Sequence, residues 1–419
     1  MTSYWWLRPS RIALFVTLPL GVFAYLAPDS FYQQFRAYNA ITDAQFFMVW
    51  LGILCFSLGS WVGEMVPPGG PPGIPVLMDE RVHRALVITL GAMATAATAI
   101  YLAPFVTNPK LALEIFSAQA GASETARRAV NQIIGITSQE NLFMLVIVLI
   151  MVKPQLTNRP RTKGEAIGLA FIFTLTLFKA IVHGERLAVI ELAVPFAVLL
   201  SAQRPRSAFW VWAPVFGTAG LLVFFAATEY LRSWVNYYAA TESSIWSFAA
   251  ARMFGYYITA FNNGAVIYSQ EHSVFFPIFT IGWFWQLPIP GLAEHLRFLT
   301  GATNDYYDML APVNVEFNNI SGMFCPFIDF GPVLGEFVWL AFGFASGRLY
   351  SLFMAGRPLG IILFPTWYIG VMEVPRVFYW GGSRYLPPLA ASLAIVISLY
   401  IFARTSARTN TFARAAYKK

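Results

Sequence analysis

Gly184-Glu185-Arg186 and the following Glu191 form a charged group that we expect at the end of a membrane helix. A charged residue at such a place is costly and is usually retained for function. Because Arg186 opens a helix, the helix dipole and free backbone N–H groups would add to its attraction for a phosphate. The alternative is an interfacial arginine that pairs with Glu185 or Glu191.

Further arginines are expected on the same side of the molecule as Arg186. They are Arg232, Arg252, Arg376 and Arg384. A planar guanidinium binds diphosphate oxygens through paired hydrogen bonds, and arginine is preferred to lysine for this. Each of these residues alone is typical of a surface. We therefore predict an anionic ligand on the condition that several of them surround one cavity.

Aromatic, amide and carboxylate side chains alternate from Asn304 to Asn319 and on to Asp329. Sugar rings stack on aromatic faces while their hydroxyl groups need polar partners, so this composition suits a carbohydrate site. The candidate sugar contacts are Tyr306, Asn314 and Asn318. A polar loop that caps a helical bundle would have a similar composition.

Three residues are candidates for a general base, namely Glu271, His272 and Asp329. Histidine titrates near neutral pH, which suits proton transfer, although a lone histidine is more often structural. The two cysteines, Cys55 and Cys325, have no metal-ligand spacing. We expect neither a metal nor a cofactor.

The elements that position these residues are membrane helices. The chain has 57% hydrophobic and 12% charged residues, whereas an ordinary soluble domain carries about 25% charged residues. Long uncharged stretches approach the roughly 20 residues that cross a bilayer. We predict an all-α integral membrane protein with about ten spans, at residues 11–28, 44–66, 85–106, 136–152, 165–182, 187–201, 208–230, 333–347, 358–372 and 386–403.

Basic residues predict the orientation, because they are retained in short cytoplasmic loops. With both termini inside, 17 of the 28 basic residues face the cytoplasm. The net charge of +7 therefore indicates topology and not a nucleic-acid partner. We treat residues 1–419 as one membrane domain in which 231–332 is a large periplasmic region. Its apolar stretches 253–267 and 274–287 are expected to be interfacial or re-entrant helices.

The segment 314–350, NVEFNNISGMFCPFIDFGPVLGEFVWLAFGFASGRLY, resembles the bacterial O-antigen polymerases, also called oligosaccharide repeat unit polymerases. The likeness lies in the Asn-Val start, the Asp-Phe-Gly run, a nearby second Gly, and a helix ending in small residues and an aromatic. GERLAVIE at 184–191 and ARMFGYYITAFNN at 251–263 also fit the family. A Thr usually follows the Asn-Val, whereas this chain has Glu316 and Phe317.

The resemblance implies a metal-independent glycosyltransferase on the periplasmic face of the bacterial inner membrane. It would move a growing glycan from one polyprenyl (undecaprenyl) diphosphate carrier onto the sugar of another lipid-linked repeat unit. Glu271, His272 or Asp329 would deprotonate the acceptor, and Arg186 with other outer arginines would stabilise the departing diphosphate. Membrane lipid is an expected partner, and a chain-length regulator protein is a candidate partner.

Other functions fit the same sequence. An O-antigen ligase would share the donor and depend more on an outer-loop histidine. A metal-dependent glycosyltransferase would use an acid in the first outer loop, for which Asp29 and Asp43 are suitable. A flippase or exporter of lipid-linked oligosaccharide would need charged residues distributed through its spans. Because ionisable groups here gather at the outer ends of the spans, the sequence favours an enzyme.

Overall fold

The computed structural model describes residues 1–69, 78–130, 133, 135–239, 244–270, 275–287, 289–300, 307–310 and 317–416. Within these ranges the chain is helical and contains no strand. Eight of the helical segments described are long and apolar enough to cross a membrane. They are Pro9–Leu26 (α1, Pro9–Ile12; η2, Ala13–Thr17; α2, Leu18–Leu26), α4 (Asp43–Met65), α5 (Glu80–Thr107), Thr137–Thr157 (η3, Thr137–Asn141; α8, Leu142–Thr157), α9 (Lys163–His183), α10 (Arg186–Gln203), Ala213–Val235 (α12, Ala213–Glu229, continued by η4, Tyr230–Tyr238) and Gly322–Met354 (η6, Gly322–Phe324; α16, Cys325–Met354).

Two further apolar stretches are shorter than these eight, α17 (Pro358–Glu373) and the part of α18 (Leu386–Ala416) that ends at Phe402. Each of the ten predicted spans falls on one of these helices. The chain is therefore an all-helical, multi-pass membrane protein. The remaining helices are α3 (Asp29–Gln33), α6 (Pro109–Phe116), α7 (Ala122–Ala129), α11 (Ala208–Val211), α13 (Ile245–Gln270), α14 (Leu292–Thr300), α15 (Tyr307–Leu310) and the short η1 (Trp5–Leu7), η5 (Gly282–Gln286) and η7 (Tyr379–Gly381).

The most extensive helix–helix contact joins α4 and α16. It rests on two pairs of glycines four residues apart, Gly59 and Gly63 on α4 and Gly343 and Gly347 on α16. A Cβ atom added at any of the four would overlap backbone atoms of the opposite helix. Membrane helices pack most closely where such small residues repeat, because the two backbones can then touch.

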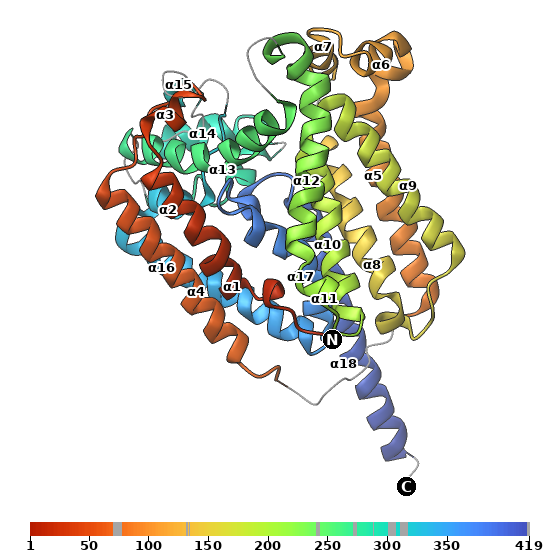
Figure 1. Cartoon of the computed structure of the whole chain (residues 1–419). Helices are drawn as coiled ribbons and strands as arrows, with labels where there is room; N and C mark the ends of the chain where they lie inside the picture. The colour runs from red at the N-terminus through yellow and green to blue at the C-terminus, as the bar shows by residue number, and fades with distance from the viewer. Residues whose placement is uncertain are drawn as a thin grey trace.

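Helix α13 contains the helix predicted over 253–267 and extends beyond it at both ends. The stretch 253–267 is part of one helix of 26 residues that is not apolar enough to be a candidate span. The prediction of a second helix over 274–287 is wrong for the residues described, because they form turns and the short η5. In Figure 1, α13 lies across the long axes of α10 and α12, near the end of the bundle that carries α6 and α7.

Candidate functional site

The start of α10 brings two opposite charges to the end of the bundle. Helix α9 ends at Gly184, whose left-handed backbone (φ 62°) closes the helix in the manner that glycine permits. Glu185 follows as the N-cap residue of α10, and Arg186 is the first residue of that helix. Each of these two neighbouring side chains enters a different group of charged residues.

Arg186 is buried and contacts α12. Its guanidinium forms an ion pair with the fully buried Glu229, and its Nε donates a hydrogen bond to Thr228 Oγ1 at 3.2 Å. The guanidinium carbon also lies 3.7 Å from the ring centre of Phe225. The other carboxylate oxygen of Glu229 lies 3.3 Å from Nε of Arg252 on α13. Two arginines from distant segments therefore share one carboxylate.

Tyr256, one turn after Arg252 on α13, lies among three arginines. Its hydroxyl is hydrogen-bonded to Arg186, and the charges of Arg186, Arg232 and Arg252 all act on it. Burial alone would raise the pKa of Tyr256, but the three guanidinium groups outweigh this and lower it to about 8. We call Arg186, Arg232, Arg252, Glu229 and Tyr256 the arginine cluster.

Aromatic rings enclose the arginine cluster. Arg252 lies 5.1 Å from the ring centre of Phe317 and 5.3 Å from that of Phe248. Such cation–π contacts stabilise a guanidinium that has little access to water. Arg232 differs, since its side chain is half-buried and forms no ion pair with any residue that the structure describes.

Arg384 enters the second group, which we call the carboxylate cluster. Its guanidinium contacts Glu185 at 2.5 Å and both oxygens of Glu191 at 2.8 Å. Buried Lys179 contacts the same Glu185 at 2.6 Å and Glu140 at 2.5 Å. With three carboxylates around two cations, Arg384 is neutralised by the protein. This arrangement does not support its predicted role in binding an anion.

Arg376 is also paired within the protein. Its Nε lies 2.8 Å from Glu373 at the end of α17. It is close enough to Tyr256 and Tyr257 to interact with both electrostatically. Of the five arginines predicted to converge, the structure therefore brings Arg186, Arg232 and Arg252 together, while Arg376 and Arg384 lie beside them in ion pairs.

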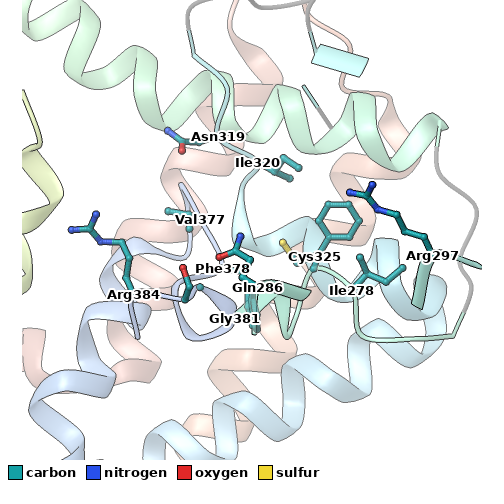
Figure 2. A pocket seen from close by; sticks show the side chains of 14 residues that line it. Ile278, Gln286, Arg297, Asn319, Ile320, Cys325, Val377, Phe378, Gly381 and Arg384 are labelled. Atoms are coloured by element: carbon teal, nitrogen blue, oxygen red, sulfur yellow. The ribbon is translucent and has the colours of Figure 1, made fainter. Parts of the chain in front are cut away.

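A cavity of about 490 Å³ includes Arg384 of the carboxylate cluster in its lining. It is formed by the segment around 278–286, the start of α16 and the loop 377–384. Figure 2 shows Arg384 and Arg297 on opposite sides of it, with Gln286 and Asn319 between them. Its lining combines amide and guanidinium side chains with two aromatic residues, Phe279 and Phe378, which is a composition that suits a sugar site.

Asp329 holds one wall of this cavity in place. Its buried carboxylate accepts hydrogen bonds from the backbone N–H groups of Phe279 (2.9 Å) and Thr280 (2.8 Å) and from Thr280 Oγ1 (2.7 Å). Two residues later, Gly331 adopts φ 76° and kinks α16 before Pro332. These bonds occupy both carboxylate oxygens. The position suits a positioning residue better than the predicted base.

Five predicted site residues remain, namely Glu271, His272, Tyr306, Asn314 and Asn318. Glu271, His272, Tyr306 and Asn314 lie outside the described residues. Asn318 is exposed, whereas the next residue, Asn319, lines the cavity. The carbonyl of Asn319 is held by the buried Asn263, whose Nδ2 donates to it at 2.9 Å.

Sequence reasoning missed Glu229, Tyr256 and the pair Lys179 and Glu140. A signal was present for two of them. Tyr256 follows Arg252 by four residues and Glu229 precedes Arg232 by three, and both spacings place side chains on one face of a helix. Lys179 and Glu140 are 39 residues apart, so no local spacing indicated their contact.

The fold and the site together define a multi-pass helical membrane protein with a buried, arginine-rich layer and an adjacent cavity at one end of its bundle. No family model, curated protein or solved structure gives a significant match to the chain.

Proposed function

We propose that this protein is a metal-independent membrane glycosyltransferase that polymerises polyprenyl-diphosphate-linked oligosaccharide repeat units into a surface polysaccharide, an O-antigen or an exopolysaccharide. The observation that carries the proposal is the arginine cluster. Arg186, Arg232 and Arg252 come from three separate elements and meet around one tyrosine hydroxyl. Like charges repel strongly in a poorly hydrated site, so their convergence favours a multiply charged anion as the ligand.

The proposed reaction joins two lipid-linked glycans. The acceptor hydroxyl attacks the anomeric carbon of the donor glycan, and the bond between that carbon and the diphosphate oxygen breaks. The diphosphate leaves on its lipid carrier, and Arg232, with Arg186 and Arg252, stabilises its developing charge. The proton of the acceptor hydroxyl passes to a base, for which Glu271 and His272 remain our candidates.

The cavity beside Arg384 provides space for a sugar unit next to the arginine cluster. Gln286, Asn319 and Arg297 offer partners for hydroxyl groups, and Phe279 and Phe378 contribute aromatic residues to the lining. We place this end of the bundle at the periplasmic face of the inner membrane. Ten spans and the distribution of basic residues then leave both termini in the cytoplasm.

Chain growth by the purified protein tests this proposal. The wild-type protein is incubated in detergent with two lipid-linked repeat units, and we expect it to extend the glycan. A flippase would not extend the glycan, because it only moves its substrate across a sealed membrane. Arg232→Gln should reduce the rate about a hundredfold, as when one donor to a transition-state anion is lost. Because Arg232 has no ion pair with a described residue, this variant should keep the fold.

Arg81→Gln is the matched control, since Arg81 is exposed in the first turn of α5 at the other end of the bundle. It should polymerise like the wild type. Arg186→Ala is a poorer test, because it leaves the buried Glu229 without this partner and costs stability as well as activity. Equal chain growth by Arg232→Gln and the wild type would overturn the proposal.

A further inference from the structure

A second cavity, of about 550 Å³, is lined by residues of α5, α8 and α9. We call this cavity the groove. Helix α5 begins at Glu80 and α9 at Lys163, and both run from there toward the arginine cluster. The charged residues of this cavity, near the starts of the two helices, therefore lie at the opposite end of the bundle. Figure 1 shows α5, α8 and α9 together on one flank of the molecule.

The part of the groove that lies farther from the starts of α5 and α9 is mainly apolar. On α5, Ile88, Gly91 and Thr95 line it at helical spacing, and on α9, Gly168 and Ile172 do the same. A Cβ atom added at Gly91 or Gly168 would meet no described atom within 4 Å. The two glycines therefore leave open a space that ordinary side chains would fill.

The end of the groove near the starts of α5 and α9 is charged. Lys153, almost fully buried, contacts Glu165 at 2.9 Å and Glu80 at 3.4 Å, and Arg159 approaches Glu80 at 4.0 Å. Arg84 is exposed and forms no ion pair with a residue that the structure describes. In the lining of the groove two cations, Arg84 and Lys153, thus accompany two carboxylates, Glu80 and Glu165, and among the described residues Lys153 is ion-paired to both carboxylates while Arg84 is paired to neither.

We propose that this groove binds an anionic phospholipid, with its headgroup at Arg84 and an acyl chain along Gly91 and Gly168. The polar and apolar parts of the groove match the two parts of such a lipid, and the unpaired cation favours a negative headgroup over a zwitterionic one. The volume is within the usual range of a ligand site, about 300–1,000 Å³. The site is independent of the proposed polymerase reaction.

Native mass spectrometry of the purified full chain tests this inference. The protein is incubated in detergent with phosphatidylglycerol or with phosphatidylcholine of the same acyl chains, and the bound lipid is counted. The wild type should retain about fivefold more phosphatidylglycerol, the effect expected of one basic residue near an anionic headgroup. Arg84→Gln should bring phosphatidylglycerol down to the level of phosphatidylcholine.

A large side chain that fills the groove should reduce the binding of both phosphatidylglycerol and phosphatidylcholine. Gly168→Leu should reduce their binding, while Gly217→Leu on α12, where added atoms also meet open space, should leave it unchanged. Gly91→Leu tests the opposite wall in case Gly168→Leu does not fold. The proposal fails if Gly168→Leu and Gly91→Leu retain as much lipid as Gly217→Leu, or if the wild type binds phosphatidylcholine as well as phosphatidylglycerol.

Discussion

Glu229 determines how the arginine cluster is arranged, because it contacts Arg186 and Arg252 at once. A buried carboxylate shared by two guanidinium groups holds them at a fixed separation, and Phe225 and Phe317 cover their faces. Arg232 is left half-buried beside them. In the proposed function, Arg232 is the group best able to reach a ligand, while Arg186 and Arg252 are positioned by the protein.

Tyr256 reports on the charge of this cluster. Its pKa of about 8 lies below the ordinary tyrosine value near 10, so folding stabilises the phenolate form. That contribution is fully present above pH ~10 and is lost as the pH falls through about 8. The stability of the wild type relative to Tyr256→Phe should therefore be constant near pH ~7 and should increase between pH ~8 and ~10.

Thermal unfolding in detergent across this pH range measures the difference. Tyr237→Phe, at an exposed position on η4, is the control and should show no such pH dependence relative to the wild type. A constant difference between Tyr256→Phe and the wild type from pH ~7 to ~10 would mean that the three arginines do not act on this hydroxyl.

At the scale of residues, the sequence predicted the charged turn at 184–186 but only part of its surroundings. Arg186 was identified because a charge at the end of a span is costly. The neutralisation of Arg384 could not be foreseen, since it depends on Glu185 and Glu191, about 200 residues earlier in the chain. Which arginine remains available to a ligand is a property of the tertiary structure.

At the scale of elements, hydropathy predicted the apolar helices, because apolar length is a local property of the sequence, and eight of the helices described are long enough to cross a membrane. The position of α13 was not predictable in this way, since long-range hydrogen bonds hold it. Asn262 donates to the carbonyl of Tyr38 and accepts from the N–H of Ala40, and Asn263 donates to the carbonyls of Phe317 and Asn319. These bonds attach α13 to two distant loops.

The contact between α4 and α16 leads to a prediction about stability. In Gly347→Ala the added methyl group would overlap the carbonyl of Ser60, so the two helices must move apart. We expect a loss of about 1–3 kcal/mol, typical of overpacking, and a lower melting temperature in detergent. Gly220→Ala, in open space on α12, should be neutral or slightly stabilising.

If Gly347→Ala and Gly220→Ala melt at the same temperature, the close contact of the two backbones is absent in solution. The kink at Gly331 belongs to the same helix, and it positions Asp329 against Phe279 and Thr280. A displaced α16 would therefore disturb the wall of the cavity as well as the packing.

At the scale of the whole molecule, the two ends of the bundle have different chemistry. One end combines the arginine cluster, the carboxylate cluster and a polar cavity under α13. The flank near the other end carries a mainly apolar groove whose charged end includes the unpaired Arg84. This division suits a protein that handles a charged, lipid-linked substrate at one membrane face and is fixed in the bilayer by lipid at the other.

Binding of polyprenyl diphosphate to the purified protein tests the central claim most directly. The wild type and Arg81→Gln should bind it with equal affinity. Arg232→Gln should bind about ten- to a hundredfold more weakly, the equivalent of one lost hydrogen bond to a charged group. If Arg232→Gln binds polyprenyl diphosphate as tightly as the wild type does, the arginine cluster is not the site of the lipid diphosphate.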